Sequence, residues 1–146
     1  MAITSAICNS FKVEILTGTH NFTASSGDTF NLALYTDSAT LSKSTTAYSS
    51  SNEITNASGS AYSAKGNALT SVTPVLSTDT AVCDFANSSW SSASFTARGC
   101  LIFNDTAAGD PAVCAIDFGG NKTVTSGTFT IEFPAASAGT AIIGIA

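Results

Sequence analysis

The sequence predicts an all-β fold: an antiparallel two-sheet sandwich, jelly-roll-like, of about seven or eight strands with a short N-terminal helix. Three observations support this prediction. Apolar and polar residues alternate with period two in several segments, clusters of turn residues separate those segments, and no long helical pattern or internal repeat occurs. We expect residues 1–146 to form a single domain, because a chain of 146 residues can bury a core without covalent staples.

The clearest alternation lies in the C-terminal half, where we expect three consecutive antiparallel strands. They cover residues 94–103, 112–118 and 129–133. Turn residues fill 104–111, and Gly119-Gly120-Asn121-Lys122 supplies positions that tolerate positive φ, so we expect a tight reversal there. Such a meander has one apolar face, which a second sheet must cover.

Four further segments read as strands. Thr29–Thr36 alternates clearly, and Thr80–Phe85 does so again. Ala68–Val72 begins another strand, which Pro74 ends or places at a sheet edge because proline lacks the N–H that a central strand needs. The apolar end Thr140–Ala146 is expected to be tied into a sheet.

The N-terminal segment 5–17 is predicted to form an amphipathic helix, capped by Thr4 or Ser5 and ended by Gly18. Its apolar stripe consists of Ile7, Phe11, Ile15 and Leu16. A helix of about three turns is unstable alone. Two interpretations stay open: the helix covers a side of its own β-domain, or it docks onto a neighbouring subunit.

Residues 37–67 form a Ser/Thr-rich excursion with few large apolar side chains. Because a long structureless loop is uncommon in a compact domain, we expect short ordered pieces near 44–49 and 53–54. The remainder is expected to be exposed and mobile, and a candidate contact region. Its Tyr48 and Tyr62 join the helix stripe as candidate interface residues, although core packing is an alternative for such aromatics.

Charge excludes several classes of partner. Charged residues are only 10% of the chain and the net charge is −5. The five basic residues are scattered, so we expect no nucleic-acid binding. No apolar run approaches the roughly 20 residues of a membrane helix, and the N-terminus lacks the pattern of a secretory signal. We therefore expect neither membrane insertion nor a signal peptide, with folding in a cytoplasm.

The residues that carry chemistry are few. We interpret the single histidine, His20, as exposed or as lying near the helix end, and Asn104-Asp105-Thr106 with Asp110 as turn chemistry in preference to a calcium site. The four cysteines have no metal-site spacing, and we interpret them as small apolar fillers without disulfides. We expect no enzymatic activity, no metal and no cofactor. The cysteines are Cys8, Cys83, Cys100 and Cys114.

The order of segments resembles a family of small structural proteins encoded by tailed phages of aquatic bacteria, cyanophages among them. The resemblance covers nearly the whole chain and rests on SAICNSFKVEILTGTHNF, GDTFNLALYT, AYSAKGNALT, WSSASFTARGCLIFND, AVCAIDFGGNKTVTSGTFTIEFP and the terminal AIIGIA. It implies a virion component made in the host cytoplasm, with the major capsid protein or other virion proteins as partners and with self-association.

Three positions on a particle fit this resemblance. A capsid decoration or cement protein would bridge neighbouring capsid subunits, a tail or head–tail connector component would form a ring, and a receptor-binding module would present aromatics to host glycans. Decoration is favoured, because a single compact sandwich has neither a fibrous repeat nor a long arm. A sugar-binding module outside any virus is the alternative of a different class.

Overall fold

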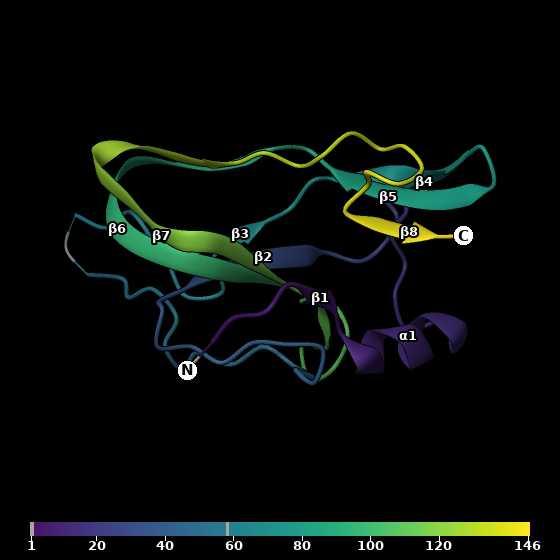
Figure 1. Ribbon diagram of the computed structural model, residues 1–146, viewed down its shortest axis with the longest axis horizontal. Coiled ribbons are helices and arrows are strands. Elements are labelled where there is room, and N and C mark those ends of the chain that lie inside the picture. The colour runs from purple at the N-terminus through teal and green to yellow at the C-terminus, as the bar shows by residue number, and fades with distance from the viewer. Residues whose placement is uncertain (1, 58) are drawn as a thin grey trace.

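The computed structural model describes residues 2–57 and 59–146 and confirms the predicted class, a mostly β fold of two antiparallel sheets with one short N-terminal helix (Figure 1). One sheet has five strands in the order β1-β7-β6-β2-β3, and the other has three in the order β4-β5-β8. The elements are β1 (Ala6–Ile7), α1 (Asn9–Leu16), β2 (Phe30–Tyr35), β3 (Asn67–Ala68), β4 (Ser71–Ser77), β5 (Thr80–Phe85), β6 (Ser88–Asn104), β7 (Ala112–Ile131) and β8 (Ile143–Ile145). The order is simpler than that of a jelly roll, since the hairpins β4–β5 and β6–β7 supply two of the neighbouring pairs.

The dominant element is one long hairpin of β6 and β7, with 17 and 20 residues. The predicted tight reversal at 119–122 is therefore wrong as a hairpin turn, because β7 continues through it and stays paired with β6. Between the pairs Ala97↔Lys122 and Gly99↔Asp117, β6 has one residue and β7 has four. Such a bulge bends a strand pair.

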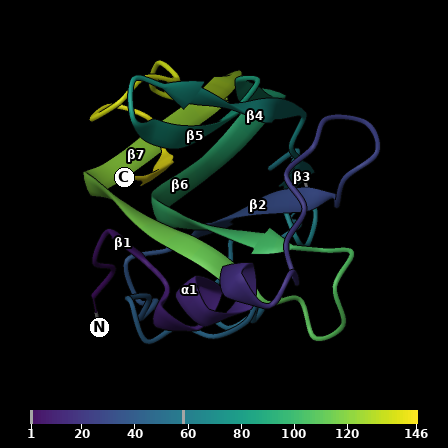
Figure 2. The ribbon, with the colours of Figure 1, turned by 90° about the vertical axis from the view of Figure 1, so that its right-hand side faces the viewer.

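Both strands fold over at this bulge, so that the hairpin has two arms. We call residues 99–104 with 112–117 the lower arm, and residues 88–97 with 122–131 the upper arm. Figure 1 shows the ribbon curling at its left-hand end, and Figure 2 shows the same corner in β7. Gly119 sits in the bulge with φ +78°, a conformation that glycine adopts without strain. The Gly-Gly pattern thus marks a change of layer in a continuous strand.

The three-stranded sheet lies beside the upper arm (Figure 1). Pro74 lies inside β4, which is an edge strand, and the register slips between Val72 and Val75, so the edge placement predicted from this proline is confirmed. The apolar C-terminus is also tied into a sheet as predicted, because β8 pairs with β5 and buries Ile143.

The core is thickest where β2 meets the end of β6. All six residues of β2 are buried, and so are 99–104 of β6 on both faces. The half-buried alternation predicted for β6 therefore fails at this end, where Cys100 and Ile102 are as buried as Leu101. A ladder of aromatic rings extends the core, with Phe22 stacked on Phe30 at 4.2 Å between ring centroids.

Gly99 is required where β6 crosses beneath the N-terminal segment. A Cβ at this position would overlap the carbonyl oxygen of Ile116 and lie 2.9 Å from the Ile3 side chain. We expect Gly99→Ala to lower the free energy of unfolding by about 2–3 kcal/mol, because the overlapped oxygen belongs to the backbone of the paired strand, which must shift to admit the methyl group. Urea denaturation measures the change. Gly120→Ala is the matched control, since nothing lies within 4 Å of its added Cβ. Equal midpoints for the two variants would contradict the close packing at Gly99.

Candidate functional site

The N-terminal helix is shorter than predicted. It spans Asn9–Leu16 instead of 5–17, with Cys8 in the N-cap position and no side-chain cap. Ile7 is not helical, because it belongs to β1 and pairs with Cys114 of β7. The predicted end is correct: the chain leaves the helix at Thr17, and Gly18 follows with φ +78°.

The helix stripe divides into buried and exposed residues. Phe11 is buried and its ring lies 4.9 Å from that of His20, so it anchors the helix on its own domain. Ile7 and Ile15 are half-buried. Leu16 is 87% exposed. Val13, which was not part of the predicted stripe, is 64% exposed. Of the two interpretations of the helix, coverage of its own domain is confirmed for Phe11, while the outer face carries apolar side chains that the domain does not cover.

A small apolar groove lies between α1 and β8, and we call it the α1–β8 groove. It has a volume of about 300 Å³ and is lined by Ile7, Phe11, Lys12, Ile15, Leu16, Ile143, Gly144 and Ile145. Ile145 is 55% exposed, and β8 is the last strand of its sheet. Four of the six predicted interface residues therefore meet in one place. The contribution of β8 was not foreseen, although the apolar C-terminus was its signal.

Tyr48 and Tyr62, the other two predicted interface residues, belong to an internal cluster. Tyr62 is fully buried, and Tyr48 is half-buried with its ring stacked on Phe103 at 4.7 Å. Both hydroxyls donate to the buried carboxylate of Glu53, each at 2.6 Å. Burial first, and the bond to Glu53 second, raise the pKa of Tyr48 to about 12 and raise that of Tyr62 further. The interface assignment of Tyr62 is wrong, because the same ring that suits an interface fills the core here.

Glu53 joins separate parts of the excursion 37–67 to one another, and Tyr62 links them to the sheet. The Glu53 carboxylate accepts a third hydrogen bond from the backbone N–H of Lys65, and the hydroxyl of Tyr62 accepts one from the N–H of Leu34 in β2. The Lys65 ammonium lies 2.7 Å from Asp105 and 2.9 Å from Asp110 in the β6–β7 turn. These two carboxylates raise the pKa of Lys65. Asp105 and Asp110 thus lie in the turn, as expected from sequence, but their carboxylates bind Lys65 of the excursion, and it is Asn104 whose side chain accepts from the turn N–H groups.

The excursion is correspondingly less exposed than predicted. The two expected ordered pieces contain one isolated β-bridge each, Ala47↔Pro111 and Tyr35↔Glu53, and no strand. Glu53, Ile54 and Tyr62 are buried anchors between exposed residues. Such anchors cannot be predicted from a polar, weakly periodic sequence, because a glutamate is buried only where it has hydrogen-bond partners, and no local sequence pattern identifies those partners.

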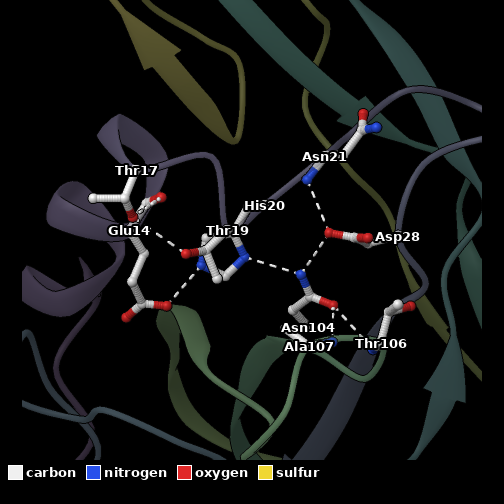
Figure 3. Close-up of polar contacts among 9 residues, drawn as sticks. All are labelled: Glu14, Thr17, Thr19, His20, Asn21, Asp28, Asn104, Thr106 and Ala107. Carbon is white, nitrogen blue, oxygen red and sulfur yellow. Dashed lines mark hydrogen bonds and ion pairs between the residues drawn. The ribbon is translucent and has the colours of Figure 1, made fainter.

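A second polar network centres on His20 and Asn104 (Figure 3). The Nε2 of His20 lies 2.9 Å from Glu14 Oε2, and its Nδ1 lies 3.1 Å from the amide nitrogen of Asn104, which also donates to Asp28 at 2.8 Å. The Asn104 Oδ1 accepts from the N–H groups of Thr106 and Ala107. The His20 side chain is fully buried, so the expectation of exposure is wrong, while its place just beyond the helix end is confirmed.

This geometry fixes the histidine tautomer. Because Asn104 Oδ1 already accepts two backbone hydrogen bonds, its amide nitrogen must be the atom that faces His20. Nδ1 therefore accepts, and Nε2 carries the proton that it donates to Glu14. A Glu–His pair that orients a catalytic base leaves the other ring nitrogen free for a nucleophile. Here an amide occupies it, and the network serves to hold α1, the 20–28 connection and the β6–β7 turn together.

The cysteines act as fillers, as predicted. All four are free, with Cys8, Cys100 and Cys114 buried and Cys83 half-buried. Burial raises the pKa of the Cys8 and Cys83 thiols to about 11 and that of Cys114 to about 12. Since the thiolate is the nucleophile, these thiols are poorly reactive near neutral pH.

Neither a metal site nor a helix that could span a membrane is found among the described residues. Across residues 2–57 and 59–146, no three His, Cys, Asp or Glu side chains gather in a way that would hold a metal ion. In the same part of the chain, the only helix is far too short and too polar to cross a bilayer.

Comparison of the chain with protein-family models, with curated proteins and with solved structures finds no match to any of the three.

The Asn104 network is open to a direct test. We expect Asn104→Ala to lower the free energy of unfolding by about 2–4 kcal/mol, because Asp28, His20 and two backbone N–H groups lose a buried partner. Asn121→Ala is the matched control; its exposed amide makes a single hydrogen bond, to Asp37, and its loss should change stability by less than about 0.5 kcal/mol. Equal denaturation curves for the two variants would show that the network contributes little.

Proposed function

We propose that this chain is a structural, non-enzymatic protein of a phage virion, and specifically a capsid decoration protein that binds the major capsid shell. The observation that carries the proposal is the α1–β8 groove, whose wall exposes Leu16 and Ile145, together with Val13, which is exposed on the same helix. The resemblance of the whole sequence to phage structural proteins supplies the kind of assembly.

The surface composition supports a role in assembly. Burying an ion in an interface costs far more than burying a hydroxyl or a methyl group, and charged residues are only 10% of this chain. Lys65 and Arg98 are already paired with acidic side chains of the same domain. Contact with a neighbour would therefore displace water from Ser, Thr and apolar side chains at low cost.

The groove favours a shell over a single tight partner. The α1–β8 groove, with a volume of about 300 Å³, accommodates one or two side chains of a neighbour, which gives a weak contact. Repetition over the symmetric shell adds many such contacts, and any protein that binds only the assembled state stabilises that state by mass action. A tail or head–tail connector component remains the alternative, since a ring also repeats one contact.

Gold-labelled antibody against this protein, applied to intact virions and viewed by electron microscopy, tests the proposal. Label distributed over the head is the expected result. Label confined to the tail or the connector would replace decoration with ring assembly, and label at the tail tip would indicate receptor binding. Virions without label, in a preparation whose major capsid protein is labelled, would contradict a virion role.

A surface variant tests the groove together with the exposed face of α1 beside it. We expect Val13→Gln with Leu16→Gln to weaken binding to particles assembled without this protein by about tenfold or more, because each apolar side chain buried at a contact is worth about 1.5–3 kcal/mol. Sedimentation with particles measures the binding. The unfolding midpoint should not change, since both side chains are exposed.

The chain offers a matched control for this variant. Val75→Gln with Leu76→Gln changes the same two residue types at 57% and 70% exposure on β4, outside the α1–β8 groove. This control should bind particles like the unaltered protein. Unchanged binding of the α1 variant, or an equal loss in both, would contradict the groove as the contact.

A further inference from the structure

A cavity lies inside the bend of the β6–β7 hairpin, and we call it the bend cavity. Its volume is about 520 Å³. Ile116 and Phe118 line it from β7 near the bulge, Phe129 and Ile131 from the upper arm, and Phe133 and Ile142 from the segment that leads to β8. The cavity lies between the two arms, because the hairpin bends at the bulge and its strands pair again on the far side.

The lining side chains are available to a ligand. All six are half-buried, so they still expose carbon atoms to the cavity. Phe118 and Phe129 lie across the bend from one another, with ring centroids 6.3 Å apart. Sites for small molecules typically have volumes of about 300–1,000 Å³ and mostly apolar and aromatic walls, and the bend cavity meets both conditions.

Two charged side chains of opposite sign flank this apolar wall. Lys122 lies on the bulge side of the upper arm and Glu132 follows the other end of that arm, and both line the cavity. Both are exposed, and in the described part of the chain neither makes an ion pair. A charged head group at the rim would meet one attracting and one repelling charge, both screened by solvent, so neither sign of charge gains a net contact.

We propose that the bend cavity binds an uncharged, elongated apolar molecule, of the class of an alkyl chain with a neutral head group. The apolar body lies between the two arms against Phe118 and Phe129, and the neutral head stays at the rim near Thr130. This site is separate from the α1–β8 groove and does not depend on the proposed function.

Decanol, with decanoate and decylammonium as charged analogues, is the probe. In the intact protein labelled at isoleucine methyl groups, decanol should shift the NMR signals of Ile116, Ile131 and Ile142 saturably, below the concentration at which it aggregates. The charged analogues should bind several-fold more weakly. Shifts confined to Ile7, Ile15 and Ile145 would move the site to the α1–β8 groove, and the absence of saturable shifts would overturn the proposal.

A cavity-filling variant provides the second measurement. Ile142→Trp, in the segment before β8, should weaken decanol binding at least tenfold, whereas Val75→Trp, on the exposed face of β4, should leave it unchanged. Decanoate that binds tenfold tighter than decanol, and loses this advantage in Lys122→Met, would overturn the uncharged class of ligand. Unchanged decanol binding in a folded Ile142→Trp protein would overturn the site. If Ile142→Trp does not fold, the isoleucine shifts of the unaltered protein decide the question.

Discussion

The pairing of β6 with β7 on both sides of one bulge is the constraint on which the rest of the structure depends. Because the two strands pair again beyond the bulge beside Gly119, one hairpin contributes to both layers of the sandwich. β1 and β2 attach to its lower arm, and the aromatic residues of its upper arm close over the core. The bend therefore sets the spacing of the layers and creates the cavity between its arms.

Two buried polar groups attach the irregular segments to this frame. Glu53 binds the hydroxyls of Tyr48 and Tyr62 within the excursion 37–67, and the Tyr62 hydroxyl in turn accepts from Leu34 in β2. Asn104 holds the 20–28 connection and the β6–β7 turn. Each is almost fully satisfied by short hydrogen bonds inside the domain, which is what permits its burial. Because Lys65 and Arg98 are paired with acidic side chains of the same domain, the surface presents mainly hydroxyls and a small number of apolar side chains.

The fold class could be predicted from sequence because it depends on period-two alternation, which β2, β5 and the upper arm display. Layer changes could not, since Gly119-Gly120 reads equally as a hairpin turn and as a bulge until the pairing partner is known. The site was predictable in part: Phe11, Ile15 and Leu16 carry a helical period, whereas the contribution of Ile145 depends on the pairing of β8 with β5. Tyr62 was misplaced because the partner of its hydroxyl, Glu53, appears in the sequence as an ordinary loop acid.

The pairing of β1 with β7 has a consequence for biosynthesis. Ala6 pairs with Ala115 and Ile7 with Cys114. More than a hundred further residues must therefore be synthesised before β1 has a strand to pair with. Non-local pairings of this kind make folding slow, because a long loop must close before the contact forms. During translation the N-terminal segment, with Phe11 and Ile15, stays without its binding surface until the hairpin has left the ribosome. The apolar side chains of β1 therefore stay unpaired for most of the synthesis of the chain, which is the condition under which chaperones bind nascent proteins.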